Sequence, residues 1–385
     1  MKKTLLAIAV LGAAAMTAQA ANVTLYGAVD GGVMYKHVQI KKNGKTLGDT
    51  ENSFKLANGL AGSNKVGIKG EEDLGNLKVG FKLENGFNIS NGAMKGGDDK
   101  RLFDREARMY VKSGFGTLSA GRFGGLASAA GSYDIFFAQA DAFDGGDNAV
   151  PYAFATSSRY DNSVAYQSPV IAGLQGTLMY SFNEEGAQVN KMKNNARYLG
   201  LGLTFNHENL NLVGVIEGHL LGKHKDPAND KIALKDDKHK NGFTYNLGAN
   251  YDFGVAKIYT GAQISRHIAL SAVESGDFNK AKSKYDDDQV NGYAFTLGSQ
   301  IPVGADLITL GAYYGQYKNA AAIDTVAKKD AKLRIYGLSG RYEHQLSKRS
   351  SLYAGLGFGQ SKVTYPENSL KQNIGQVYLG LHHNF

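Results

Sequence analysis

The sequence contains no cysteine and no tryptophan, and only 5 of its 385 residues are proline. Without cysteine the chain cannot form disulfides, so its stability must come from another source. Long apolar runs are also missing beyond the extreme N-terminus: the mean hydropathy is −0.30 and charged residues make up 20%. A bundle of membrane-spanning helices, which needs about 20 apolar residues per span, is therefore excluded. Disorder is excluded because aromatic and branched residues recur from end to end.

A strong excess of charge of one sign is missing too. Lysine and arginine number 43 against 35 aspartates and glutamates, a formal net charge of +8. Two of the lysines, Lys2 and Lys3, lie in a segment that we expect to be removed, which leaves 41 basic residues and a net charge of +6. Because acidic residues are interleaved along the whole length, nucleic acid is not an expected partner.

The first twenty residues have the three-part order of a secretory signal. A basic start at Lys2 and Lys3 precedes an apolar core over residues 4–17, and Ala18 to Ala20 form a small-x-small cleavage site. The apolar core is too short to cross a bilayer as a helix. We therefore expect residues 1–20 to be a cleaved signal peptide and residues 21–385 to be the mature domain.

Beyond residue 21 the apolar residues recur with a period of two, which indicates β-strands. Residues 199–205 alternate leucine or phenylalanine with smaller and polar residues, and residues 243–253, 352–359 and 376–385 repeat this pattern. Each segment is about ten residues long, the length that crosses a bilayer as a tilted strand. Sixteen such segments are predicted, starting near Val23, Asn64, Leu77, Asp104, Thr117, Asn162, Leu174, Ala196, Leu210, Gly242, Val255, Gln289, Asp306, Lys332, Ser350 and Ile374.

The predicted connections alternate between short and long. Short ones include residues 74–76, 113–116, 168–173, 207–209, 302–305 and 346–349, and long polar ones span 37–62, 89–103, 123–161, 184–195, 222–241, 268–288, 319–331 and 364–373. This alternation is typical of an outer-membrane barrel with both termini in the periplasm. The predicted fold is all-β, a 16-stranded antiparallel transmembrane β-barrel. A secreted β-sandwich or propeller is the alternative, but it would not explain loops sorted by side.

Strand parity places a basic cluster on one wall of the lumen. Val66 and Ile68 face lipid, so Lys65 and Lys69 face inward, and the same argument points Lys82 with Glu84, and Glu106 with Arg108, into the lumen. Arg122 stands at a strand end, and Arg159 opens the next strand after the longest connection. The predicted pore-lining basic residues are Lys65, Lys69, Lys82, Arg108, Arg122 and Arg159.

The longest connection, residues 123–161, is the candidate constriction. A structureless connection of this length is uncommon unless it is functional. It is rich in aromatic residues, which favours partial burial, and a sixteen-stranded barrel leaves a lumen wide enough to admit it. Folded inward, its acids would face the basic wall and sort solutes by size and charge. Those acids are Asp134, Asp141, Asp144 and Asp147.

Several motifs resemble the trimeric general porins of Gram-negative bacteria, particularly the beta-proteobacterial type. Residues 23–27 and 30–33 resemble the first strand of that family, and residues 63–75 its second strand and first turn. Residues 116–118 with 121–122, residues 159–164 with Tyr166 and 168–169, and the terminus 380–385 are also similar to the family. The resemblance covers essentially the whole mature chain.

The resemblance implies a homotrimeric channel in the cell outer membrane, with the long third loop folded into the lumen and with passive diffusion of ions and small hydrophilic solutes. Implied partners are outer-membrane lipid, lipopolysaccharide and the barrel-assembly machinery, which would read the terminal Phe385. Ala165 stands where the family often has a basic residue, and Arg108 where an aromatic is more usual. The family's ion preference therefore does not transfer intact.

Other functions remain open at this point. A substrate-selective channel would share the architecture, while an adhesin or an outer-membrane hydrolase would differ in function. No combination of nucleophile, carboxylate and histidine indicates an enzyme. The nine histidines are scattered, so no metal site is expected, and the glycines of residues 355–359 are not followed by a helix pattern, so no cofactor is expected. Asp286, Asp287 and Asp288 form an acidic loop tip that is either solvated or binds calcium.

Overall fold

The computed structural model describes residues 22–48, 50–95, 101–147, 150–183, 195–221, 240–269, 289–319 and 331–385. The expected signal peptide and the acidic tip at Asp286 lie outside them. The strands are β1 (Asn22–Lys42), β2 (Lys45–Thr46), β3 (Glu51–Asn58), β4 (Lys65–Asp73), β5 (Leu77–Gly86), β6 (Glu106–Ser113), β7 (Gly116–Gly124), β8 (Arg159–Gln167), β9 (Leu174–Ser181), β10 (Arg197–His207), β11 (Leu210–Leu220), β12 (Gly242–Asp252), β13 (Lys257–Ala269), β14 (Gln289–Val303), β15 (Asp306–Asn319), β16 (Lys332–Gln345), β17 (Ser350–Thr364) and β18 (Ser369–Asn384).

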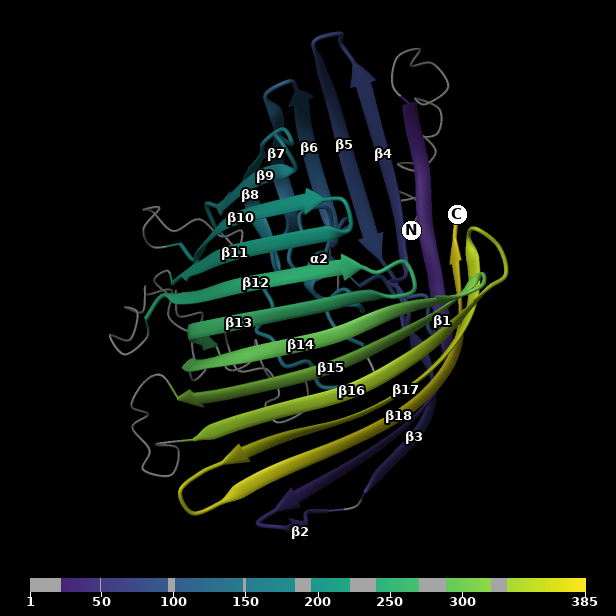
Figure 1. Cartoon of the computed structure of the whole chain (residues 1–385), viewed down its shortest axis with the longest axis vertical. Coiled ribbons are helices and arrows are strands. Elements are labelled where there is room, and N and C mark those ends of the chain that lie inside the picture. The colour runs from purple at the N-terminus through teal and green to yellow at the C-terminus, as the bar shows by residue number, and fades with distance from the viewer. Residues whose placement is uncertain are drawn as a thin grey trace.

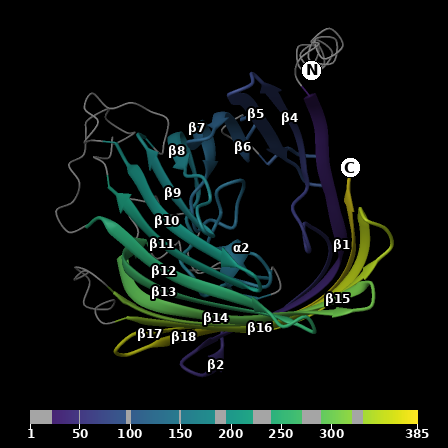
Figure 2. The same ribbon diagram turned by 45° about the horizontal axis from the view of Figure 1, so that its top comes forward.

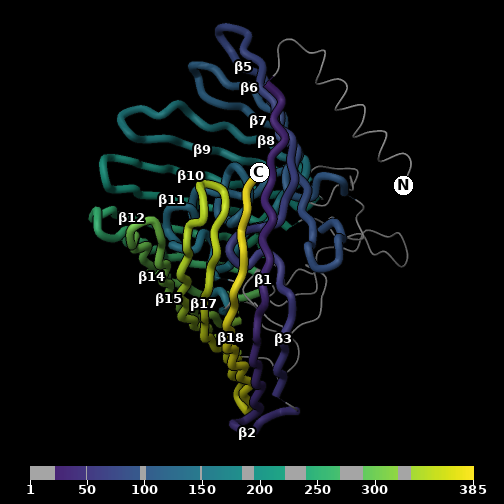
Figure 3. Tube along the Cα trace, turned by 90° about the vertical axis from the view of Figure 1, so that its right-hand side faces the viewer, coloured from purple at the N-terminus to yellow at the C-terminus, as the bar shows by residue number. Residues whose placement is uncertain are grey.

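These strands form one antiparallel sheet that closes on itself (Figure 1). Each strand pairs with its sequence neighbour, and β1 pairs with β18 over a long ladder from Ala28↔Asn384 to Lys42↔Leu370. Figure 3 shows β1 and β18 side by side. Because β3 and β4 pair with successive parts of β1, they occupy one wall position, and the two-residue β2 is part of a hairpin. The described residues therefore form the predicted 16-stranded barrel.

Three predicted connections differ from the structure. Residues 37–62 were predicted to be a loop, but β1 continues to Lys42 and β3 pairs back onto it. Residues 364–373 were also predicted to be a loop, but β17 and β18 are joined by residues 365–368 alone. In both places the sheet continues past the apolar belt, where polar side chains hide the strand pattern. The longest connection runs from 125 to 158, slightly shorter than the predicted 123–161.

The period of two separates an outer apolar face from an inner polar one. On β10 the outward-facing Leu199, Leu201 and Leu203 are 41%, 55% and 53% exposed. Tyr198, which faces inward on the same strand, is fully buried. Inward-facing residues of β12 such as Asn246 are buried as well. Water inside a barrel would leave such residues exposed, so their burial indicates that another part of the chain covers them.

The covering segment is the lumen loop, which we define as residues 125–147 and 150–158. It contains the short helix α2 (Phe137–Ala140), which lies inside the ring of strands in Figure 2 and contacts β11, β12 and β13. Phe136, Phe137 and Phe154 of this loop are at most 1% exposed. The main hydrophobic core thus lies inside the barrel, between the loop and the wall. No helix among the described residues is long and apolar enough to cross a membrane.

A buried aspartate holds the break between β3 and β4. The Asp30 carboxylate accepts hydrogen bonds from the backbone N–H groups of Leu60, at 2.8 Å, and Gly62, at 2.9 Å. It also accepts one from the Tyr353 hydroxyl at 2.7 Å and lies 3.1 Å from Nδ1 of His382. These contacts pair the Leu60 and Gly62 N–H groups, which the interrupted ladder does not pair, at the point where the chain leaves β3 and enters β4.

The closing ladder generates the first testable prediction. A Cβ atom at Gly32 would overlap the backbone carbonyl of Leu379 on β18, whereas a Cβ at Gly375, in the same pair of strands, would meet nothing within 4 Å. Gly32→Ala should therefore destabilise the barrel by about 1–3 kcal/mol, the usual cost of overpacking. Gly375→Ala should leave stability nearly unchanged. The measurement is the temperature at which the folded band converts to the unfolded band on a denaturing gel. Equal transitions for the two variants would contradict this account of closure.

Candidate functional site

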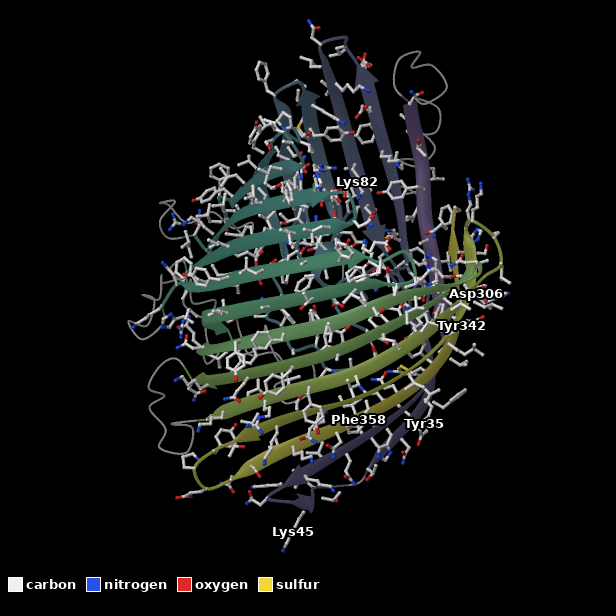
Figure 4. The ribbon with its side chains drawn as sticks, viewed as in Figure 1. Tyr35, Lys45, Lys82, Asp306, Tyr342 and Phe358 are labelled. Carbon is white, nitrogen blue, oxygen red and sulfur yellow. The ribbon has the colours of Figure 1, made fainter. Side chains whose placement is uncertain are left out.

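The predicted basic wall is a network of paired charges in the structure. Lys82 (labelled in Figure 4) lies 2.8 Å from Oε2 of Glu106 and 3.6 Å from Oε2 of Glu84. Arg105 contacts Glu84 at 2.6 Å, and Arg108 contacts Glu106 at 2.8 Å. Both glutamates are buried, at 2% and 0% exposure. Lys82 and Arg108 do face inward as predicted, but the neighbouring acids offset much of their positive charge.

This network also binds the lumen loop. The Ser132 hydroxyl donates to Glu106 at 2.8 Å, and Ser132 Oγ accepts hydrogen bonds from Lys82, at 3.2 Å, and Arg108, at 3.3 Å. The Tyr133 hydroxyl donates to Ser119 on β7 at 2.7 Å, and the Arg108 guanidinium lies 5.3 Å from the Tyr133 ring. The charged wall therefore fixes one end of the loop.

Arg122 and Arg159 lie near each other at the ends of β7 and β8. Arg122 contacts Asp161 at 2.5 Å and donates through Nε to the Asp104 carbonyl at 2.9 Å. Arg101 contacts the other oxygen of Asp161 at 2.9 Å. Arg159 is half-buried and has no ion pair within the described residues. Asp161 thus neutralises part of this predicted basic group, while Arg159 keeps its charge unpaired.

Lys65 and Lys69 lie on β4, on the lumen side as parity predicts. Lys65 is half-buried opposite Ala28 on β1, and Lys69 is exposed, with Nζ 5.4 Å from the ring centroid of Tyr26. In the part of the chain that the structure describes, neither lysine forms an ion pair. Together with Arg159, these two lysines carry the positive charge of the wall that no ion pair among the described residues offsets.

The other side of the lumen loop packs on β10 to β15. The Glu217 carboxylate on β11 accepts hydrogen bonds from the backbone N–H of Ala127, at 3.0 Å, and from the Tyr198 hydroxyl, at 2.6 Å. Gln263 on β13 both accepts from the backbone N–H of Ala155 and donates to its carbonyl, at 2.8 Å each. The wall offers side-chain partners to loop backbone groups that would otherwise be buried unpaired.

A glycine on the wall makes this close approach possible. A Cβ at Gly248 on β12 would lie 2.5 Å from Cβ of Ala140 in α2 and 3.2 Å from the Phe136 ring. Because Gly248 has no side chain, α2 can lie directly against the inner face of β12. The sequence pattern of alternating glycine indicated a strand, but it did not indicate what the glycines would face.

Two of the predicted constriction acids are anchors rather than exposed charges. Asp141 is 2% exposed and accepts hydrogen bonds from the hydroxyls of Tyr152, at 2.9 Å, and of Tyr313 on β15, at 3.2 Å. Asp147 is 4% exposed and accepts from the Tyr378 hydroxyl on β18 at 2.9 Å. The expectation that these carboxylates face the basic wall is wrong, because the aromatic side of the loop turns toward the opposite wall and takes them with it.

The other two acids, Asp134 and Asp144, form a pair within the loop. Asp134 accepts from the backbone N–H of Phe137 at 3.4 Å, and the Asp144 carboxyl lies beside it within hydrogen-bonding range. Burial, followed by repulsion from Asp144, raises the pKa of Asp134 well above its usual range. Burial likewise raises the pKa of Asp141. Asp144 is the one predicted loop acid that is exposed.

Sequence reasoning missed several residues that shape the site. Glu84 and Glu106 were placed inward by parity, but their pairing with the basic residues was not anticipated. Parity could have identified Glu217 as an inward-facing acid, since its neighbours Val215 and Ile216 alternate in exposure. Tyr313 and Tyr378 carried no distinguishing signal. In the described residues no group of three or more His, Asp or Glu is arranged to hold a metal ion.

Phe385 follows β18 and completes the closing ladder. Its backbone N–H and carbonyl pair with the carbonyl and N–H of Gly27, both at 3.1 Å, and its ring covers Gly27. The ring is 43% exposed on the outer face. The terminal residue is therefore part of the barrel wall, directly beside the beginning of β1.

Comparisons with known proteins agree with this architecture. The model of the Gram-negative porin family matches residues 7–364. An outer membrane porin protein of Bordetella pertussis is 34% identical over 277 residues, which are 67% of this chain and 68% of the relative. Outer membrane porin protein 32 of Delftia acidovorans is 29% identical over 367 residues, 94% of this chain and 90% of the relative. The solved structure of an anion-selective porin from Comamonas acidovorans has a TM-score of 0.63 at 22% identity, covering 95% of this chain and 100% of that one, which shows likeness of fold.

The raised pKa of Asp134 generates the second prediction. A carboxyl whose pKa is raised by folding stabilises the folded loop below its unfolded pKa of about 4, and this stabilisation is lost as pH rises through the folded pKa. Docking of the lumen loop should therefore weaken between pH 4 and neutral pH. Asp134→Asn should reduce this dependence, because an uncharged amide retains the acceptor oxygen. Hydrogen exchange of residues 125–147 across this pH range measures the effect, and wild-type protection that rises with pH would contradict it.

Proposed function

Because this chain belongs to the Gram-negative porin family, it forms a water-filled channel in the outer membrane for passive diffusion of small solutes, and we propose that the passage runs between the lumen loop and the charged wall. The chain is a channel and not an enzyme. It resides in the outer membrane of a Gram-negative bacterium, where pairing of β1 with β18 closes the sheet and removes the open strand edges that lipid does not tolerate.

The observation that carries this proposal is the set of contacts that the lumen loop makes. Its aromatic side lies on β10 to β15 and reaches β18 through Tyr378, while Ser132 joins it to the charged wall of β5 and β6. The loop thus fills the part of the lumen beside β10 to β18. The remaining opening is bordered by the loop, β1 and the wall from β4 to β8, where Lys65, Lys69 and Arg159 lie.

The unpaired charges beside this opening favour anions. Lys65, Lys69 and Arg159 form no ion pair within the described residues, whereas Lys82, Arg105 and Arg108 are offset by buried glutamates. On the loop, Asp144 is the exposed acid. Three cations against one exposed carboxylate produce a positive potential that raises the local concentration of anions. A narrow lumen screens these charges less than an open surface does.

The chain's partners are part of the same proposal. We infer that it assembles as a homotrimer, as porins of this family generally do, and exposed apolar side chains on β1 and β3, such as Leu25 at 63% and Phe54 at 74%, are available for that contact. Outer-membrane lipid and lipopolysaccharide would cover the rest of the outer face. The barrel-assembly machinery would recognise the terminal strand, whose last residue, Phe385, presents a half-exposed ring beside Gly27.

Charge removal at the opening tests the proposed selectivity. The double variant Lys65→Gln with Lys69→Gln should move the reversal potential in a salt gradient toward cations. The permeability ratio should change about two- to threefold per charge, because a unit charge about 4 Å away in water is worth about 1 kcal/mol before screening. Asp144→Asn should move the potential in the opposite direction. Both shifts should shrink as salt concentration rises.

A matched control uses Lys112, which faces inward on β6 but lies four residues closer to the turn than Arg108. Lys112→Gln removes the same charge outside the proposed narrow opening, so its effect on the reversal potential should be small. A shift in Lys112→Gln as large as that in the double variant, or no shift in the double variant at low salt, would show that the opening lies elsewhere.

The role of Phe385 and the trimer are tested together. Wild-type protein extracted from cells should migrate on an unboiled denaturing gel as a trimer that becomes a monomer on boiling. Deletion of Phe385 should leave the export signal cleaved after Ala20 and should reduce the trimer in the outer membrane several-fold, with aggregates in the periplasm. Migration of the unboiled wild type as a single barrel would refute the trimer. Normal levels of the deletion variant would show that the terminal residue carries no assembly information.

A further inference from the structure

A row of four cations crosses the outer face of the barrel. Arg334 on β16 lies directly opposite Lys362 on β17, Lys362 opposite Lys371 on β18, and Lys371 opposite Lys41 on β1. All four have outward parity, as the exposed Tyr35 on β1, Leu338 on β16, Phe358 on β17 and Val377 on β18 show. Like charges directly opposite each other destabilise a sheet, so this arrangement needs a compensating anion.

The described part of the chain supplies no such anion. None of the four side chains forms an ion pair or a hydrogen bond there, and the residues opposite the two ends of the row are the uncharged Gln316 and Thr46. One step further from the membrane, Lys318 and Lys332 form another pair of opposed, exposed cations. Glu367, in the turn between β17 and β18, forms no ion pair with any of them.

An apolar groove lies below the row on the same strands. It is an open depression of about 1050 Å³, and its lining includes Ala312, Gly340, Ala354, Leu338 and Phe358. Figure 4 labels Phe358 at this level. Leu338 follows Arg334 by four positions, and at about 3.3 Å per residue the cations lie about 13 Å above the start of the groove.

The vertical order of these features matches the order of groups in a lipid. From the long-connection end inward come the cations, then the polar aromatic Tyr336 with Gln360, and then the apolar groove. Aromatic residues with a polar tip mark the boundary between headgroups and acyl chains. A molecule that presents phosphates at the level of the row would place its acyl chains at the groove.

We propose that this face is a binding site for a phosphorylated, multiply acylated lipid of the outer leaflet. Phosphate groups bridge the opposed cations of Arg334, Lys362 and Lys371, and one acyl chain occupies the groove over Gly340. The several oxygens of a phosphate group can accept hydrogen bonds from more than one cation at once. A single carboxylate of the chain has fewer oxygens to offer. This site depends on the outer-membrane location and is independent of the passage inside the barrel.

The test uses the full mature chain, refolded in detergent and titrated with bisphosphorylated hexa-acyl lipid A, with bound lipid counted by native mass spectrometry. The triple variant Arg334→Gln, Lys362→Gln and Lys371→Gln should bind this lipid at least about tenfold more weakly than the wild type. Arg266→Gln is the matched control, since Arg266 is also exposed with outward parity but lies opposite Phe243 rather than a cation. It should bind as the wild type does.

Two further probes separate the parts of the proposal. The same lipid without its phosphates should bind the wild type and the triple variant equally weakly. Inorganic pyrophosphate should compete poorly with the phosphorylated lipid, because pyrophosphate cannot fill the groove. Equal affinity of the triple variant and the wild type, or full displacement by pyrophosphate at equal concentration, would overturn the proposal. Loss of the oligomer in the triple variant, with no lipid bound by the wild type, would assign the row to a contact between copies and also overturn it. The triple variant should conduct as the wild type does, because the row lies outside the lumen. Its conductance therefore tests the proposed channel separately from the lipid site.

Discussion

Closure of the sheet between β1 and β18 is the constraint on which the other features of the molecule depend. In lipid every backbone donor and acceptor of a strand must be paired, so the first and last strands have to meet in register along the membrane. Gly32 permits this register, and the backbone pairing of Phe385 with Gly27 continues it to the last residue. Once the sheet is closed, alternate residues must face inward, and these residues determine what the lumen can hold.

The inner face is divided between two kinds of wall. From β10 to β15 it consists largely of glycines, amides and tyrosines, which accept a loop with an aromatic side. On β4 to β6 it carries charged residues with buried acids among them, which contact the loop through Ser132, and on β7 Ser119 accepts a hydrogen bond from Tyr133. The loop carboxylates follow the same division: Asp141 and Asp147 receive tyrosine hydroxyls and position the loop, while Asp144 stays exposed. Two acids of the loop therefore position it, while a third keeps an exposed carboxylate.

Most of the barrel could be predicted from sequence, because a strand with lipid on one side and a polar interior on the other alternates strictly. The alternation fails where both faces are polar, and for that reason β3 and the beginning of β18 were predicted to be loops. Within the site, parity gave the direction of Lys65, Lys82 and Arg108 correctly. It could not give the pairing of Lys82 with Glu106 or of Asp141 with Tyr313, since these contacts depend on the register of strands far apart in sequence and on the path of the loop.

The central claim is that α2 of the lumen loop turns one face to the wall and the other to the passage. Ala140 is fully buried against Gly248, whereas Ala138, two residues away, is exposed. The chain has no cysteine, so a single introduced thiol can be modified cleanly. The decisive measurement is the single-channel current of Ala138→Cys and Ala140→Cys during exposure to a bulky, water-soluble thiol reagent. The account predicts a stepwise fall in current for Ala138→Cys and no reaction for Ala140→Cys. Modification of Ala138→Cys without any change in current would contradict it.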